Sequence, residues 1–291
     1  YPNGLQFTLI DETNGINAFS PVSDFGYDVE EGDSVRVKGV IDQYLGLAQI
    51  RMDTLHFEGS GFDTETPSIV AEMSEETESR MVKLKCVELV NPNEWTNTIP
   101  AFDVGITFGN QEITMRVDAN TDLFGQPAPI GVFGVTGIGG QRDYNEPLVD
   151  GYTITPRGQF DLTEPVVADF LVVSPWDGSS GAVEIFNLST GAGAYHWAMG
   201  DGTSYETNTP EHYYTESGTF EITLTAYSED GECSTQTIQE IESNWVGVEE
   251  VKTPEFDAYP NPATSEVTID LKSGPVSSLV MYDSKGRLVI N

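Results

Sequence analysis

The side chains that most often bind zinc are few in this sequence and lie far apart. The histidines are His56, His196 and His212, and the cysteines are Cys86 and Cys233. A zinc site needs three or four ligands that converge on the metal, and neither a His-Glu-x-x-His nor a Cys-x-x-Cys pattern is present. We therefore interpret the histidines as structural residues.

Serine also lacks the setting of a nucleophile. Many hydrolases hold the catalytic serine in a Gly-x-Ser-x-Gly turn between a strand and a helix. The serines at 59–61 and 178–181 instead stand in glycine-containing stretches that are typical of loops and linkers. The residues present therefore predict no catalytic centre, and we expect that this chain is not itself an enzyme.

One acidic segment has the spacing of a calcium ligand set. Asp118, Asn120 and Asp122 alternate with other residues, which can bring three oxygen ligands towards one hard cation. The glycine and the distal glutamate that complete an EF-hand loop are absent from this segment. We expect a loop stabilised by its own hydrogen bonds that requires no cofactor, and calcium binding is the alternative.

A short basic stripe is the feature best suited to nucleic acid. Alternation places Arg36 and Lys38 on the outer face of a strand, where Arg51 from the next strand and Tyr44 can join them to contact phosphates and bases. Residues 1–157 hold 25 acidic side chains beside nine basic ones, and the acidic excess repels phosphate. We therefore expect an ordinary solvated strand face and no nucleic-acid partner.

The length and charge of the chain indicate several domains in an extracellular or saline setting. A chain of 291 residues suggests more than one domain. The 47 acidic and 13 basic residues give a net charge of −34, and residues 158–251 contain no lysine or arginine. No apolar run approaches the roughly 20 residues that span a bilayer, so we expect no transmembrane segment.

Two stretches of the chain repeat at an offset of 98 residues. Both copies show short alternating apolar segments separated by glycine, which is typical of β-strands. A further strand, 81–90, precedes the second copy, and its counterpart falls before residue 1. The first copy is therefore expected to lack its opening strand, in a chain that is a fragment of a longer protein. The matched pairs are 4–10 with 102–108, 15–19 with 113–117, and 35–41 with 133–139.

Each copy resembles a small OB-like barrel. The strand at 35–41 and its counterpart carry the resemblance, with Gly39 and Gly137 where a barrel strand bends sharply. The resemblance implies two modules, 1–62 and 63–163, of a kind found downstream of extracellular hydrolases in secreted surface proteins. An unrelated pair of β-sandwiches is the alternative. Residues 59–66 are expected to be linker, and 74–78 the only helical turn.

Residues 164–246 contain a second set of ordered motifs. Trp197-Ala-Met-Gly-Asp-Gly202 is followed by Pro210-Glu-His-Tyr-Tyr214 and by Gly218-Thr-Phe220. These motifs resemble those of a PKD domain, an immunoglobulin-like β-sandwich, with Met199 in place of the usual phenylalanine. The resemblance implies structural roles for Trp197, Gly200, Asp201, Gly202, Pro210, His212, Tyr214 and Gly218. Because Cys86 and Cys233 then fall in different modules, we expect no disulfide between them.

The end of the chain combines a proline-rich entry with alternating strands. Tyr259-Pro-Asn-Pro262 predicts a stiff turn into a strand, and the segment at 282–286 predicts a second turn. After a linker at 247–253, residues 254–291 resemble the first part of the type A C-terminal sorting domain of type IX secretion cargo. The residues that carry this resemblance are Tyr259, Pro260, Asn261, Pro262, Ile269, Leu271, Tyr282 and Gly286.

The sorting resemblance implies a destination and a set of partners. Cargo of this family crosses the outer membrane through the type IX translocon and meets a shuttle protein. A sortase then cleaves the tail and can attach the protein to lipopolysaccharide, so the protein is expected at the cell surface or outside the cell.

Taken together, the sequence predicts an all-β chain of two OB-like barrels, the first incomplete, with a PKD β-sandwich and a partial sorting β-sandwich. The leading hypothesis is a non-catalytic binding or spacer region, whose ligand would be an extracellular polymer or protein. The alternatives are the accessory region of an extracellular nuclease or phosphoesterase with its catalytic domain upstream of Tyr1, and a surface adhesin.

Overall fold

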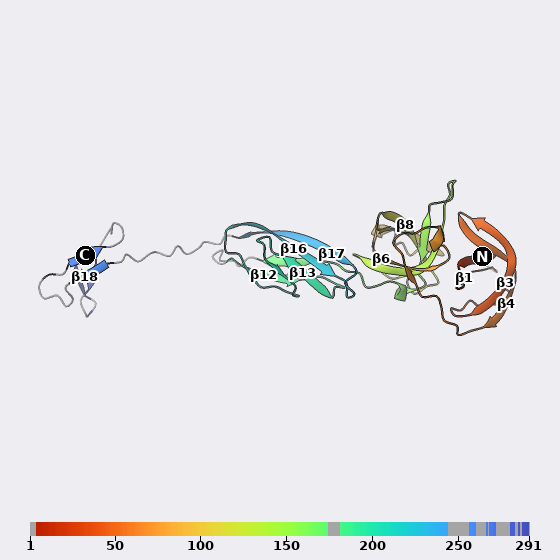
Figure 1. The fold of residues 1–291 in the computed structure, drawn as a ribbon, viewed down its shortest axis with the longest axis horizontal. Helices are drawn as coiled ribbons and strands as arrows, with labels where there is room; N and C mark the ends of the chain where they lie inside the picture. Colours follow the sequence, from red (N-terminus) through yellow and green to blue (C-terminus); the bar gives the residue numbers. More distant parts are fainter. Residues whose placement is uncertain are drawn as a thin grey trace. The chain divides into compact units, whose positions relative to one another are not determined.

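The computed structural model describes residues 4–173 and 181–243, and in the tail 256–259, 266, 268–271, 280–282, 285 and 287–290. The chain divides into two compact units, Tyr1–Trp245 and Val246–Asn291. The regular elements are almost all strands, and the helices among these residues are short 3-10 turns (Figure 1). The predicted all-β class is confirmed.

The first sheet is an open half-barrel. Its strands lie in the order β1-β2-β4-β3, and β2 runs parallel to β4. At Gly39 the register of β3 against β4 shifts, and a Cβ atom there would lie 2.0 Å from the carbonyl oxygen of Arg51, so only glycine allows this close approach. The strands are β1 (Leu5–Ile10), β2 (Gly15–Ser20), β3 (Ser34–Tyr44) and β4 (Leu47–Gly59).

The second sheet closes into a five-stranded barrel, here called the second barrel. Its order is β6-β7-β8-β10-β9, and β6 also pairs with β9 to close the ring. The barrel encloses a core in which Leu84, Ile106, Met115 and Ile154 are fully buried. The closed barrel agrees with the predicted OB-like fold class. The strands are β6 (Met81–Leu89), β7 (Ala101–Phe108), β8 (Gln111–Asp118), β9 (Phe133–Gln141) and β10 (Tyr152–Thr155), with a short β5 (Ser68–Ile69) beside β6.

The two sheets share one topology, which supports the internal repeat. The order β1-β2-β4-β3 corresponds to β7-β8-β10-β9, and the parallel pair is β2 with β4 in one and β8 with β10 in the other. The hairpin loops differ, since residues 45–46 join β3 to β4 whereas residues 142–151 join β9 to β10. Within the described ranges the first sheet has no counterpart of β6.

Helical turns are more numerous than the sequence prediction allowed. η1 (Glu75–Thr77) forms where a turn was expected, but η2 (Pro92–Glu94) and η3 (Gln159–Asp161) were missed. At η2 the side chain of Asn91 accepts a hydrogen bond from the Asn93 N–H, and proline occupies the first helical position. Both are ordinary signals of a helix start.

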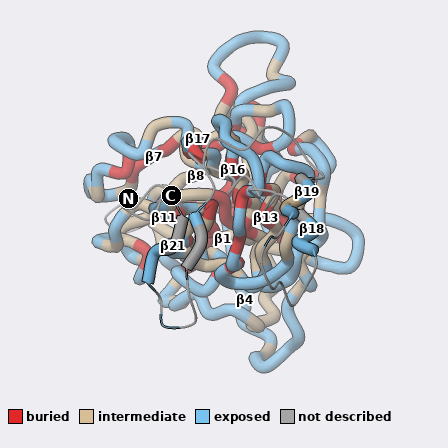
Figure 2. Tube along the Cα trace, turned by 90° about the vertical axis from the view of Figure 1, so that its left-hand side faces the viewer, coloured by how far each residue is buried: buried red, intermediate tan, exposed pale blue. Residues whose placement is uncertain are grey.

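The described residues 170–173 and 181–243 form a β-sandwich of two sheets. One sheet has the order β11-β12-β15 and the other β14-β13-β16-β17. Figure 2 shows buried residues along β13 and β16, and the core between the sheets includes Phe170, Ile185, Trp197, Ile222 and Leu224. The strands are β11 (Phe170–Val173), β12 (Ala182–Asn187), β13 (Ala194–Ala198), β14 (Ser204–Tyr205), β15 (His212–Tyr213), β16 (Gly218–Tyr227) and β17 (Ser234–Ser243).

The tail unit contains two short antiparallel strand pairs. β18 (Phe256–Tyr259) pairs with β19 (Thr268–Leu271), and Tyr259 lies opposite Thr268. β20 (Met281–Tyr282) pairs with β21 (Leu288–Ile290).

The prediction that Cys86 and Cys233 do not pair is wrong, because they form a disulfide with Cα atoms 5.3 Å apart. The register of β6 against β9 shifts between Leu84 and Val87, and Cys86 has a φ of 58°. This bulge turns the side chain out of the strand ladder, towards the hairpin that joins β16 to β17. The bridge therefore links the second barrel to the β-sandwich.

Candidate functional sites

The motif of the β-sandwich folds into a buried cluster around a glycine turn. Gly200 and Gly202 have φ values of 81° and 93°, which favour glycine. Between them the carboxylate of Asp201 accepts a hydrogen bond from the Thr203 N–H at 2.9 Å. The indole N–H of Trp197 donates to the Thr207 carbonyl oxygen at 3.0 Å. Both bonds join residues between 197 and 207, so they stabilise the turn and the segment that follows it.

His212 is 4% exposed and lies between two polar partners. Its Nδ1 is 3.1 Å from the Tyr205 hydroxyl, and its Nε2 is 3.0 Å from Asp201 Oδ2, off the direction of an aligned hydrogen bond. Burial raises the pKa of Asp201, but the Thr203 hydrogen bonds and the nearby His212 outweigh burial and leave the pKa lowered. The ring is therefore enclosed by the fold and supports it.

Tyr214 completes this cluster from the other side. Tyr214 is 1% exposed, and its hydroxyl donates a hydrogen bond to the Met199 carbonyl oxygen at 2.7 Å. Its ring stacks on the ring of Phe220, with the ring centroids 4.0 Å apart. Burial, followed by the charge of Asp201, raises the pKa of the Tyr214 hydroxyl. These contacts anchor the segment after His212 to the turn before Asp201.

We expect Tyr214→Phe to lower the free energy of unfolding of the β-sandwich by about 1–2 kcal/mol, because a buried carbonyl loses its donor. Urea unfolding followed by intrinsic fluorescence measures the change. The adjacent Tyr213 is 66% exposed, so Tyr213→Phe is the matched control, with an expected change within about 0.5 kcal/mol. Equal effects of the two variants would contradict the role assigned to Tyr214.

The predicted calcium segment is a turn whose carboxylates have partners. Asp118 Oδ1 accepts from the backbone N–H and the side-chain amide of Asn120, both at 2.8 Å. Asp122 Oδ1 accepts from the Gln159 N–H at 2.7 Å, which ties the turn to η3. Among the residues that the structure describes, no group of three or more His, Cys, Asp or Glu side chains is placed to hold a metal ion.

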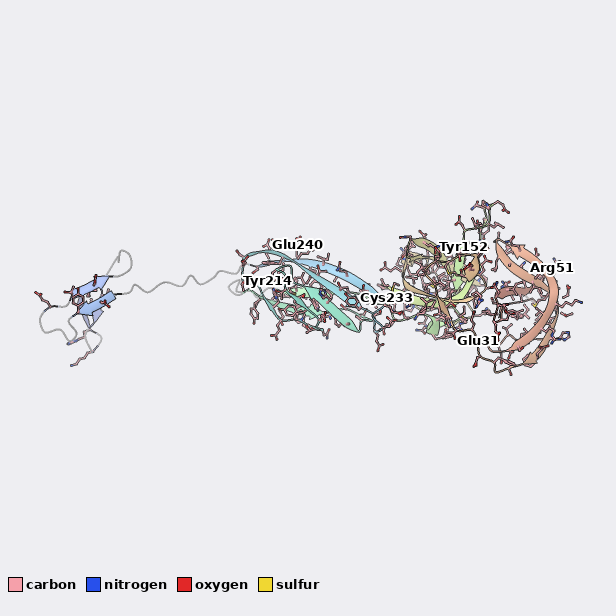
Figure 3. All side chains as sticks on the ribbon, viewed as in Figure 1. Glu31, Arg51, Tyr152, Tyr214, Cys233 and Glu240 are labelled. Atoms are coloured by element: carbon pink, nitrogen blue, oxygen red, sulfur yellow. A yellow bond between two sulfur atoms is a disulfide. The ribbon has the colours of Figure 1, made fainter. Side chains whose placement is uncertain are left out.

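The predicted basic stripe lies on one face of the first sheet. Alternation along β3 puts Arg36, Lys38 and Val40 on the same face of the sheet. Val40 is paired with Arg51 of β4, so Arg51 lies on that face too. Tyr44, at the end of β3, is 64% exposed. Figure 3 shows Arg51 on the β3–β4 side of this sheet. Arg36 is ion-paired with Glu58 at 2.6 Å, which leaves less positive charge for a phosphate. That this face is an ordinary solvated strand face without a nucleic-acid partner stays a prediction.

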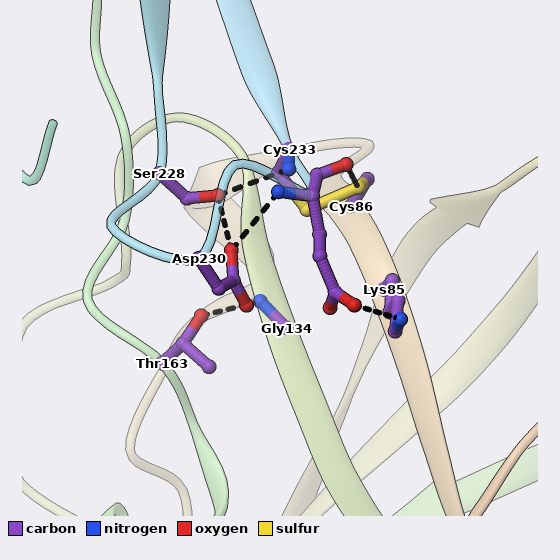
Figure 4. Close-up of a disulfide and its surroundings, with 8 residues drawn as sticks. Lys85, Cys86, Gly134, Thr163, Ser228, Asp230 and Cys233 are labelled. Atoms are coloured by element: carbon purple, nitrogen blue, oxygen red, sulfur yellow. Dashed lines mark hydrogen bonds and ion pairs between the residues drawn. A yellow bond between two sulfur atoms is a disulfide. The ribbon is translucent and has the colours of Figure 1, made fainter. Parts of the chain in front are cut away.

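The surroundings of the disulfide were missed by sequence reasoning. Beside the bridge Lys85 forms an ion pair with Glu232, and Asp230 accepts hydrogen bonds from the Ser228 hydroxyl at 2.5 Å and from the Glu232 N–H at 3.1 Å (Figure 4). Those bonds and the nearby Lys83 lower the pKa of Asp230. An even number of cysteines in an exported chain was the available signal.

A carboxyl group lies between the first sheet and the second barrel. The pKa of Glu78 is raised to about 7, mainly because the carboxyl group is partly buried and secondly because of the negative charge of Glu75. A hydrogen bond with the Ala48 backbone lowers the pKa by a smaller amount. The unfolded chain loses this proton near pH 4.5. Between that pH and pH 7 folding therefore becomes progressively less favourable, and the full penalty remains above pH 7.

We expect Glu78→Gln to raise the free energy of unfolding at pH 8 by about 1–3 kcal/mol and to change it little at pH 4. Chemical unfolding at both pH values measures this difference. Glu76→Gln on the same 3-10 turn is the matched control, because Glu76 is exposed. A gain that is the same at pH 4 and pH 8 would show that ionisation of Glu78 is not its cause.

The sorting motif is only partly within the described residues. Tyr259 ends β18 and is 51% exposed, and Ile269 in β19 lies opposite Ala258. Leu271 ends β19 and Tyr282 ends β20. Pro260, Asn261, Pro262 and Gly286 lie outside the described residues.

Comparisons with known proteins agree with both motif assignments. Residues 185–242 match the family model of the PKD domain, and residues 257–291 match that of the secretion system C-terminal sorting domain. The crystal structure of the PKD1 domain from the Vibrio cholerae metalloprotease PrtV is 26% identical over 26% of this chain and 94% of its own, with a TM-score of 0.24. The PKD1 domain of Vibrio anguillarum Epp is 23% identical over 29% of this chain and 99% of its own, with a TM-score of 0.26. No curated protein matches.

The fold and the two family matches define a class: a multi-module, all-β protein that carries a PKD domain and a C-terminal sorting domain. The sorting domain implies export through the outer membrane, to the cell surface or the extracellular space. In the described part of the chain, no helix is long and apolar enough to cross a membrane.

Proposed function

We propose that residues 1–246 are a non-catalytic binding or spacer region, which the tail delivers to the cell surface. The observation that carries this proposal is the Cys86–Cys233 disulfide, because it joins the second barrel and the PKD domain, which together with the first sheet form one compact unit. A cross-linked pair of modules resists bending at their junction, as a spacer requires. We also propose the module boundaries 1–62, 63–163, 164–246 and 254–291.

The polar groups of the PKD motif support a structural role over catalysis. His212 and Tyr214 are almost fully buried, and Asp201 accepts bonds from its own turn. A general acid or base must reach the proton that it transfers. His212 and Tyr214 are closed off from solvent, and the exposed Asp201 uses its carboxylate to hold the Thr203 N–H of its own turn.

The tail is the proposed contact with the export machinery, through the translocon, the shuttle protein and the sortase. The chain divides after Trp245, so the tail is a compact unit of its own. The exposed Tyr259 is followed in the sequence by Pro260-Asn-Pro262. Backbone that is fixed by proline loses less entropy when it docks on a partner.

A direct test of the non-catalytic role is turnover. The purified full chain is incubated with single-stranded DNA and with bis-p-nitrophenyl phosphate, with and without divalent cations. We expect no product above the blank. Turnover that survives further purification and disappears in His212→Gln, with the fold retained, would overturn the proposal.

The accessory region of an extracellular nuclease is the second candidate, because Arg36, Lys38 and Arg51 share one exposed face. The acidic excess leads us to expect single-stranded DNA binding no tighter than about 10⁻⁴ M at physiological salt. Fluorescence anisotropy with the full chain measures it. Sub-micromolar binding that is lost in the triple alanine variant of the stripe, but kept in Arg116→Ala, would favour the nuclease accessory role.

A further inference from the structure

The hairpin that joins β3 to β4 lies against two polar side chains from η1 and β9. A Cβ atom at Gly46 would lie 1.8 Å from Gln141 Oε1, so this amide oxygen is in direct contact with the hairpin backbone. Two residues further on, the Ala48 backbone forms a hydrogen bond with the carboxyl group of Glu78. Gln141 and Glu78 therefore approach the same hairpin of the first sheet.

Two oxygen atoms at this place lack a hydrogen-bond donor among the described residues. They are Gln141 Oε1 and Glu78 Oε1, and both atoms are buried. Gln141 is 1% exposed, and its Nε2 donates to the carbonyl oxygens of Leu148 at 3.2 Å and Asp150 at 3.0 Å. These bonds fix the orientation of the amide group, so its oxygen stays directed at the hairpin. A buried acceptor without a partner is costly, which points to a bound ligand.

Glu75 adds a second carboxylate to the same place. Its Oε1 accepts hydrogen bonds from Gln141 Nε2 at 3.2 Å and from the Tyr152 hydroxyl at 3.1 Å. Because the two polar atoms of an amide group are about 2.2 Å apart, Gln141 Oε1 lies within roughly 5.5 Å of this oxygen. The negative charge of Glu75 also acts on Glu78. Two like charges and an unpartnered carbonyl oxygen therefore lie close together.

The basic side chain that follows Glu78 in the sequence does not balance these charges. Arg80 forms an ion pair with Glu65 and donates to the Thr13 carbonyl oxygen at 3.3 Å. Among the described residues, no salt bridge includes Glu75 or Glu78. Carboxylate and amide oxygens with uncompensated negative charge are the ligands that a hard cation prefers.

We propose that Glu75, Glu78 and Gln141 bind one calcium ion beside the β3–β4 hairpin. The two glutamates supply carboxylate oxygens, Gln141 supplies its amide oxygen, and water completes the coordination shell of about six to eight oxygens. The ion holds η1 and β9 together at the hairpin, and so stabilises the contact between the first sheet and the second barrel.

This site differs from the segment at 118–122, where the carboxylates already have hydrogen-bond partners. It contains two carboxylates and an amide, which is compatible with the absence of a group of three or more His, Cys, Asp or Glu side chains in the described part of the chain. Calcium sites of extracellular modules bind with a Kd of about 10⁻⁴–10⁻³ M, which suits the destination that the sorting domain implies.

Hydrogen exchange of the full chain, first treated with a chelator, tests the site. Calorimetric titration with calcium chloride gives the Kd, which we expect at about 10⁻⁴–10⁻³ M. At a calcium concentration of about ten times the Kd, mass action should slow exchange at the amides of residues 43–48 by about tenfold. Sodium chloride at equal ionic strength is the control for charge screening, because the chain has a net charge of −34.

The variant Glu78→Gln removes one of the two charged ligands. Binding that is at least about tenfold weaker leaves no more than about a twofold slowing at the same calcium concentration. In chelator this variant is expected to be more stable than the parent chain, so a lost calcium effect does not reflect a lost fold.

Glu76→Gln removes the same charge from an exposed position of the same turn and should keep the tenfold slowing. The proposal is overturned if calcium does not slow exchange in the parent chain. It is also overturned if Glu78→Gln responds as strongly as the parent chain, or if Glu76→Gln loses the response as well.

Discussion

Deletion of residues 246–291 should leave the protein in the periplasm and abolish its appearance at the cell surface. The reason is that these residues form a separate compact unit and match the sorting domain over 257–291. The upstream modules keep their own cores, so the loss should concern transport and not folding. Surface protease accessibility in intact cells, compared with the periplasmic fraction, measures the outcome.

Two controls separate transport from stability. The purified truncated chain should unfold with the same thermal midpoints as the upstream modules of the full chain. A chain in which an unrelated segment of equal length replaces the tail should also stay in the periplasm. If the truncated chain reached the cell surface at normal yield, residues 246–291 would not be needed for export.

Removal of the disulfide should cause the second large effect. Closing a loop between residues 86 and 233 restricts the unfolded chain, and loss of a native disulfide costs about 2–5 kcal/mol of unfolding free energy. We expect the double variant Cys86→Ser, Cys233→Ser to unfold its barrel and PKD domain in separate transitions. Differential scanning calorimetry measures both the number and the midpoints of these transitions.

The ion pair beside the bridge offers a matched control. Lys85→Ala removes the contact with Glu232 but leaves the disulfide, and both side chains are partly exposed. The expected loss is about 1 kcal/mol or less. If Lys85→Ala and the double serine variant behaved alike, the disulfide would not be what couples the two modules.

The assignments that were predictable from sequence depend on residues close together in the chain. The PKD motif contains Trp197, Asp201 and His212 within a short stretch of sequence. Its turn has positive φ angles at positions 200 and 202, and both positions are glycine. The repeat was likewise visible, since its strands keep their spacing. The topology of the two sheets follows the same order.

The features that were missed arise from contacts between distant parts of the chain. Cys86 and Cys233 meet because a bulge in β6 turns one cysteine towards the β16–β17 hairpin. Cys86 lies in β6 and Cys233 lies next to β17, and this separation in the chain did not exclude a contact between them. Similarly, the bond from the Gln159 N–H to Asp122 joins two segments that no local pattern relates.

The most direct test of the account is to attach residues 246–291 to an unrelated periplasmic reporter. The reporter is expressed in a host with a working type IX system and in a translocon mutant of that host. We predict that the reporter reaches the cell surface or the medium in the first strain and accumulates in the periplasm of the second. A reporter that remains periplasmic in both strains, although folded and intact, would contradict the role of the tail as the export signal.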